Sequence, residues 1–197
     1  MQEIEFKFQV PVKKRKALQK AFTLLKAEPI HLAAQYFDTA DQTLAKHCIS
    51  IRRRQENDEW KQTFKAVNSA KVLSRLELEF DIAPPETTTL DLDNYKDYSA
   101  IYKKLKRALG LPLPTLELLF ETNIQRLRIL QDVGNSTVEI ALDIGKIFEA
   151  QNNVDIFEIE FELKQGSIED LIAFIRPWVQ KYQLSLDTHS KSDYGLL

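Results

Sequence analysis

Alternating apolar and charged residues open the chain. Ile4, Phe6, Phe8 and Val10 are separated by charged or polar residues. Successive side chains of a β-strand point to opposite faces, so the pattern predicts a strand with one apolar and one charged face. By the same reasoning we predict seven further strands, at residues 34–39, 44–54, 59–67, 73–82, 119–132, 136–149 and 154–164.

Three other segments have apolar residues at helical spacing, and we predict helices at 12–27, 99–110 and 167–182. Polar caps and prolines mark the expected ends of these helices. They are Pro11 before the first helix and Pro29 after it, Ser99 and Ser167 as N-caps, Gly110 as a C-cap, and Pro177 as a kink or break in the third helix.

Most of the predicted strands are joined by short, hairpin-like connections, whereas 83–98 has no clear period and is expected to be a loop. These features indicate the α+β class with antiparallel strands. About eight strands can close into a barrel, so we expect a closed eight-stranded antiparallel barrel with a few helices packed outside. The length fits one domain, 1–197.

Composition narrows the possible partners. The net charge of −2 gives no overall attraction to nucleic acid or to an anionic membrane. The single cysteine, Cys48, excludes an internal disulfide framework and fits a reducing compartment. No apolar run approaches membrane-spanning length, and the first residues do not resemble a signal peptide. We therefore expect a cytoplasmic protein that binds neither nucleic acid nor membrane, as a monomer or homodimer.

The charged faces of the strands permit two interpretations. In the first, they face solvent on an open sheet, where mixed charges are ordinary. In the second, the sheet closes around them, and its lumen must be wet or filled by a ligand because isolated buried charges are too costly. A polyphosphate with a divalent metal would suit both signs of charge, since arginine and lysine bind phosphate oxygens and carboxylates bind Mg²⁺ or Mn²⁺. With only five glycines and no glycine-rich phosphate loop, phosphate binding would depend on side chains.

Several segments, in order, resemble the CYTH superfamily, the triphosphate tunnel metalloenzymes. The opening E-I-E-F-K resembles its E-x-E-x-K signature. Similar matches follow along the chain: YFDT, IRRR, WKQTFK, SRLELEF, FETNIQRLRI, VEIALDIGKI, FEIEFELKQG and HSKSDYG. The last segments are most similar to the bacterial inorganic triphosphatase branch. In HSKSDYG the family's expected arginine is replaced, because Asp193 and Tyr194 precede Gly195.

The resemblance implies a role for each matching residue. Catalytic roles fall to Glu5, Lys7, Asp143 and Glu160. The implied metal ligands are Glu3, Glu5, Glu158 and Glu160, with Glu77, Glu79 and Asp143 as further acidic ligands for a second metal or for the attacking water. Triphosphate would be bound by Lys7, Arg52, Arg54, Lys65, Arg75, Arg126, Arg128 and Lys191. Arg75 and Arg128 in this set, and also Glu139, have the larger chance of being structural.

The implied activity is metal-dependent hydrolysis of inorganic triphosphate, with Mg²⁺ or Mn²⁺ as cofactor. Three alternatives remain open: thiamine triphosphatase, an adenylate cyclase of the same fold, and a polyphosphate- or nucleotide-binding module without activity. Members of the bacterial branch often carry a second, helical, histidine-rich domain after this one. We expect such a domain to be absent or to lie outside these 197 residues.

Overall fold

The computed structural model describes residues 4–67, 75–149 and 153–188. Its strands are β1 (Glu5–Gln9), β2 (Glu28–Asp38), β3 (Ile49–Glu56), β4 (Glu59–Val67), β5 (Arg75–Ile82), β6 (Thr89–Leu90), β7 (Leu116–Val133), β8 (Ser136–Phe148), β9 (Asn153–Gln165) and β10 (Ser185–Asp187). The helices are α1 (Val12–Leu24), α2 (Thr43–Lys46), α3 (Ser99–Leu109) and α4 (Ile168–Tyr182), with a 3₁₀ turn at Asp93–Tyr95. None of the helices in this part of the chain is long and apolar enough to span a membrane.

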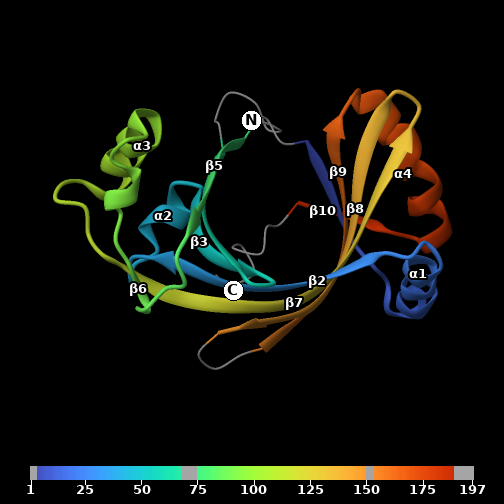
Figure 1. Cartoon of the computed structure of the whole chain (residues 1–197), viewed down its shortest axis with the longest axis horizontal. Coiled ribbons are helices and arrows are strands. Elements are labelled where there is room, and N and C mark those ends of the chain that lie inside the picture. Colours follow the sequence, from blue (N-terminus) through green and yellow to red (C-terminus); the bar gives the residue numbers. More distant parts are fainter. Residues whose placement is uncertain (1–3, 68–74, 150–152, 189–197) are drawn as a thin grey trace.

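All strands belong to one antiparallel sheet in the order β10-β1-β9-β8-β7-β2-β3-β4-β5, with β6 paired to β7. The sheet curves strongly, so that it has an inner and an outer face, and α1, α3 and α4 lie outside it (Figure 1). The predicted α+β class and antiparallel pairing are therefore confirmed.

The predicted eight-stranded closed barrel is wrong for the described residues. The sheet has ten strands, and no hydrogen-bonded pairing in this part of the chain joins its edge strands β5 and β10. Strand β1 pairs with β9 on one side and with β10 on the other. Since β10 occupies the second edge of β1 at Lys7–Gln9, β5 cannot close the sheet against that stretch.

Two cores cover the outer face at opposite ends of the sheet. Leu18 and Phe22 of α1 and Leu171 and Ile175 of α4 pack on β1, β8 and β9. Ile101 of α3 belongs to the second core, with β3 and β4. Leu18 and Phe22 lie four residues apart, as do Leu171 and Ile175, and this spacing puts both side chains of each pair on one face of its helix. The alternation of the strands therefore directs apolar side chains outward, against the helices.

Other local predictions had mixed outcomes. Pro11, Gly110 and Ser167 lie at helix ends as predicted, and Ser167 accepts a hydrogen bond from the Asp170 amide. The cap before α3 is Tyr98 rather than Ser99, and α4 is not broken by Pro177. The first helix ends at Leu24, so Pro29 does not end it but lies in β2.

The segment predicted as one strand at 44–54 begins instead with α2. The buried carboxylate of Asp38 accepts hydrogen bonds from the amides of Leu44, at 2.8 Å, and Ala45, at 3.0 Å. A carboxylate that satisfies the free N–H groups of a first turn stabilises helical backbone there. The strand therefore begins only at Ile49, and the tertiary contact with Asp38 overrides the local sequence pattern.

Candidate functional site

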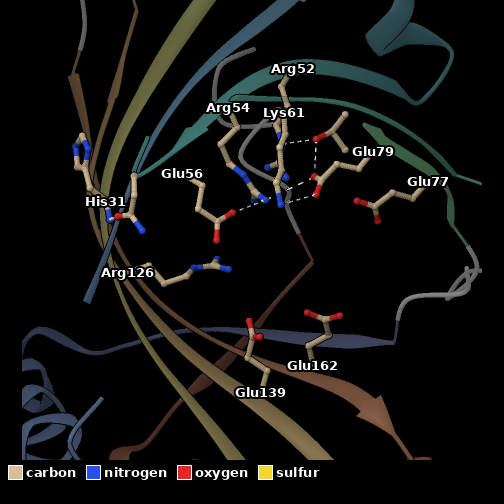
Figure 2. Close-up of polar contacts among 12 residues, drawn as sticks. His31, Arg52, Arg54, Glu56, Lys61, Glu77, Glu79, Arg126, Glu139 and Glu162 are labelled. Carbon is tan, nitrogen blue, oxygen red and sulfur yellow. Dashed lines mark hydrogen bonds and ion pairs between the residues drawn. The ribbon is translucent and has the colours of Figure 1, made fainter. Parts of the chain in front are cut away.

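Cross-strand pairing brings most of the predicted site residues to the inner face of the sheet. Lys7 pairs with Glu160, Asp143 with Glu158, and Arg126 with Asp143. Directly paired residues of antiparallel strands point to the same face. Figure 2 shows side chains from β3, β4 and β5 pointing toward those of β7, β8 and β9 across this face. The charged face predicted from the alternation is therefore an inner face.

Three carboxylates form an acidic cluster, here called the acidic triad: Asp143 on β8 with Glu158 and Glu160 on β9. Each offers an oxygen, and these oxygens all lie within 4.8 Å of one another. All three residues are buried, and Asp143 is fully inaccessible. Buried carboxylates this close repel one another unless cations compensate them. Within the described part of the chain, Glu5, Glu77 and Glu79 are not members of this group.

Arg126 on β7 supplies one of the compensating cations. Its Nε and Nη2 donate to the two carboxylate oxygens of Asp143 at 2.6 and 2.8 Å, and Nη2 also donates to Glu160. Burial alone would lower the pKa of the Arg126 guanidinium, but the charges of Asp143 and Glu160 outweigh this effect and raise the pKa well above its ordinary value. The charge of Glu5 acts in the same direction, which places Glu5 on the same side of the site.

Lys7 on β1 supplies the second cation. Its Nζ lies 3.3 Å from Glu158 Oε2 and 3.6 Å from Asp187 Oδ2. Asp187 belongs to the short strand β10 and also accepts a hydrogen bond from Gln9 at 2.6 Å. All three charged groups are buried. Asp187 was not anticipated, because a three-residue strand gives too little alternation to be recognised in the sequence.

A second charged group lies on β3, β4 and β5, on the opposite side of the inner face (Figure 2). Arg54 Nη2 lies 3.2 Å from Glu56 and 3.5 Å from Glu79. Thr63 donates to Glu79 at 2.9 Å. Burial acts to raise the pKa of the Glu79 carboxyl, but the charge of Arg54 and the Thr63 hydrogen bond outweigh it, and the pKa lies below its ordinary value.

Arginine is concentrated in this second group. Arg52 donates to the hydroxyls of Tyr36 at 3.4 Å and Thr63 at 3.5 Å. Burial, followed by repulsion from Arg52, lowers the pKa of Arg54, and Arg126 across the site adds to the repulsion. The guanidinium groups of Arg52 and Arg54 therefore lie close enough to repel each other on this side of the inner face. Such a face attracts an anionic ligand.

The remaining predicted residues have ion-pair partners other than the acidic triad or lie outside the described part. Lys65 Nζ lies 3.2 Å from Glu77 on β5. Arg128 donates to Glu28, an exposed partner, at 2.7 Å. The predictions for Glu3, Lys191 and the Arg75 side chain fall outside the described residues, although the Arg75 backbone pairs in β5.

Apolar side chains also occupy part of the inner face, which the sequence analysis did not anticipate. Tyr36 and Phe120 stack with ring centroids 4.4 Å apart, and both belong to a buried cluster. The remaining members are Ile30, Leu32, Ala34, Ile124, Ile147 and Ile156, with Leu119 packed against them. The pairing of Ile30 with Arg126 and of Tyr36 with Arg52 puts these residues on the charged face. Their alternation in β2 was missed because the strand was predicted to begin only at residue 34.

The donor set fits a hard divalent cation. The triad offers only carboxylate oxygens, which Mg²⁺ and Mn²⁺ prefer over nitrogen or sulfur ligands. Guanidinium and ammonium groups opposite the triad fit the oxygens of phosphate groups. The face can therefore bind a metal and a polyanion side by side, which is an arrangement suited to the chemistry of phosphate esters and anhydrides.

Relatives of known structure share the fold. A protein described as a "putative adenylate cyclase" from Bacillus halodurans superimposes with a TM-score of 0.67 at 20% identity, covering 96% of this chain and 94% of that one. A Hippeastrum protein, described as a "putative adenylyl cyclase" with a dominant triphosphatase activity, gives a TM-score of 0.64 at 17% identity, covering 98% of this chain and 95% of that one.

Sequence comparison identifies the family. The chain is 32% identical over 201 residues to the inorganic triphosphatase of Haemophilus influenzae, with all of this chain and 55% of that protein aligned. It thus spans about half the length of the curated relative it matches. The CYTH domain model matches residues 1–193. The resemblance found in the strand motifs is confirmed, and this chain belongs to the CYTH family.

Proposed function

We propose that this chain hydrolyses inorganic triphosphate to diphosphate and phosphate on the inner face of its sheet. The observation that carries the proposal is the buried triad of Asp143, Glu158 and Glu160, which the strand register puts on the same inner face as the cations of β3 and β4. A site that only bound an anion would gain nothing from three clustered carboxylates, because like charges raise the cost of binding it. The relative named inorganic triphosphatase supports the same substrate.

The triad would hold Mg²⁺ or Mn²⁺, with Glu5 and Glu3 as further candidate ligands from β1 and the residues before it. When bound, such an ion supplies charge neutralisation and Lewis acidity at phosphate oxygens. Glu77 and Glu79 are paired with Lys65 and Arg54, so we assign them to positioning these cations unless a second ion is present.

The cations of the chain would bind the substrate itself. Arg52, Arg54 and Lys65 offer several N–H donors along β3 and β4, and a guanidinium matches two phosphate oxygens at once. Lys7 and Arg126 would approach from the triad side, where charge develops on the terminal phosphate. We assign lesser roles to Arg75, Arg128 and Lys191.

The reaction would be an in-line attack of water on the terminal phosphorus. Phosphoryl transfer depends mostly on positioning and charge stabilisation, and it needs no covalent intermediate. Carboxylates of the site, with Glu5 and Asp143 as first candidates, would orient the water and accept its proton. We also retain as predictions that 1–197 forms one domain, that it is cytoplasmic and that it is monomeric or dimeric.

The test measures phosphate release from inorganic triphosphate, thiamine triphosphate and ATP, each with Mg²⁺, Mn²⁺ or chelator. We expect the highest kcat/KM for inorganic triphosphate. Preference for thiamine triphosphate would instead identify a thiamine triphosphatase. Release of diphosphate and cyclic AMP from ATP would identify a cyclase. Binding of triphosphate without turnover under any of these conditions would leave a binding module and would reject the proposal.

A further inference from the structure

Arg126 contacts the same carboxylates that would hold a metal ion. Both oxygens of Asp143 accept hydrogen bonds from its guanidinium, at 2.6 and 2.8 Å, and Glu160 accepts a third. Asp143 and Glu160 are two of the three members of the acidic triad. A guanidinium and a divalent cation draw on the same oxygen lone pairs, so the two cannot use them fully at the same time.

The third member of the triad is compensated as well. Lys7 Nζ lies 3.3 Å from Glu158 Oε2, and both residues are buried. The triad with Arg126 and Lys7 therefore combines three negative and two positive charges. A divalent cation added to this group would meet two positive charges in a poorly hydrated environment, where charge repulsion is strong.

A bound polyanion would give the Arg126 guanidinium a second set of partners. Arg126 lies opposite Arg54 on the inner face (Figure 2), and the charges of the two guanidinium groups repel each other. A polyanion lying between β3 and β7 would attract Arg126 away from the carboxylates and relieve this repulsion. Arginine has a long and flexible side chain, so its head group can change partners without a change in the sheet.

We propose that Arg126 is an internal counter-ion that competes with divalent metal for Asp143 and Glu160 and transfers to the phosphate when metal and substrate bind. This inference rests on the proposed function, because it takes the triad as the metal site. Its consequence is a coupling between the binding of the two ligands. Metal alone must displace Arg126 from the carboxylates of Asp143 and Glu160, whereas bound triphosphate provides new partners for the displaced guanidinium.

The proposal predicts an unusual sign for a mutation at Arg126. Removing the guanidinium should strengthen metal binding in the absence of substrate. A residue that only bound phosphate would leave metal affinity unchanged when removed, and a residue that only held the carboxylates in place would weaken it. Arg52 is a matched control, because it is also a candidate phosphate ligand, but its hydrogen bonds go to Tyr36 and Thr63.

The experiment is calorimetric titration of the substrate-free protein with Mn²⁺, comparing the wild type with Arg126→Gln and Arg52→Gln. We expect Arg126→Gln to bind Mn²⁺ about tenfold more tightly than the wild type, within the usual range of coupling between sites. Arg52→Gln should stay within about twofold of the wild type by the same measure. In thermal melts, Mn²⁺ should raise the melting temperature of Arg126→Gln by more than that of the wild type. Equal or weaker Mn²⁺ binding by Arg126→Gln overturns the inference.

Two further variants keep the outcome decisive. If Arg126→Gln does not fold, the neutral and similarly long Arg126→Met decides: tighter Mn²⁺ binding than the wild type supports competition, and equal or weaker binding rejects it. Glu160→Gln separates the two proposals. If it removes Mn²⁺ binding while the Arg126 variants gain none, only the inference fails. If it binds Mn²⁺ like the wild type, the triad is not the metal site and both proposals fail.

Discussion

The guanidinium of Arg126 on β7 donates to both carboxylate oxygens of Asp143 on β8, its direct cross-strand partner. Asp143 is fully buried, and only a small part of the Arg126 side chain is accessible. This bidentate pair links the predicted phosphate-binding residues to the predicted metal ligands. It also determines how mutations of the site should affect folding.

Arg126→Ala should destabilise the metal-free protein. Loss of one partner leaves buried carboxylates without their counter-ion, which typically costs about 3–5 kcal/mol of unfolding free energy. Turnover should fall by roughly 10²-fold or more, as expected when a phosphate clamp is removed. Urea denaturation in chelator measures the first effect. Arg128→Ala is the control for stability: its partner Glu28 is exposed, so a change below about 1 kcal/mol is expected. Equal stability of Arg126→Ala and the wild type would contradict the assignment.

Asp187 should hold Lys7 in place from β10. In Asp187→Ala, Lys7 and Gln9 lose a buried acceptor, and the unfolding free energy should fall by about 1–3 kcal/mol. We also expect a lower kcat/KM for triphosphate, because Lys7 is no longer held between two carboxylates. Ser185→Ala, at an exposed position of the same strand, should change neither quantity. If both variants behaved alike, Asp187 would have no special role.

Gly145 should be required for the close approach of β7 and β8 beside the Arg126–Asp143 pair. A Cβ at Gly145 would lie 2.1 Å from the Asn123 carbonyl oxygen and 2.8 Å from Ile124 Cα, so the backbone would have to move. Gly145→Ala should cost about 1–3 kcal/mol or more through overpacking and should reduce turnover by displacing Asp143. Denaturation and steady-state kinetics test this against Lys146→Ala, an exposed neighbour. A stable and active Gly145→Ala variant would show that the strands can separate without harm.

The pKa of Glu79 predicts a loss of stability in acid. Because this pKa is lowered in the folded protein from its ordinary value of 4.5, folding favours the ionised carboxylate. Its stabilising contribution is complete above the ordinary value and disappears as the pH falls through the lowered pKa. In chelator, Glu79→Gln should therefore be less stable than the wild type at pH 7, and the difference should shrink progressively as the pH falls below 4.5. A difference independent of pH would exclude this electrostatic origin.

The alternation of side chains was sufficient to predict the location of the main strands and which of their faces is charged. It succeeded because each long strand has one face against the helices and one face on the inside, as in β9 with Phe161 outward and Glu160 inward. The triad could be anticipated only through the family resemblance, because spacing within one strand does not reveal which strands become neighbours.

Other features depend on contacts between distant segments. The helix α2 forms where a strand was predicted, because Asp38 satisfies its first amides. The predicted closure failed because β10, too short to recognise, pairs with β1. The pairing of Arg126 with Asp143 could not be predicted from the sequence either, because Asp143 lies 17 residues away on the other strand of a hairpin. The effect of Arg126 on stability likewise follows only from its contacts with Asp143 and Glu160, which the sequence does not reveal.

Metal dependence tests the central claim most directly. The measurement is phosphate release from inorganic triphosphate by the wild type and by Glu5→Gln, Glu160→Gln and the double variant, in chelator and with Mg²⁺ or Mn²⁺. The account predicts almost no hydrolysis in chelator, full recovery in the wild type when either ion is added, and loss of activity in each folded variant at ordinary metal concentrations. Hydrolysis by the wild type that continues in excess chelator, or by the double variant with metal, would contradict it.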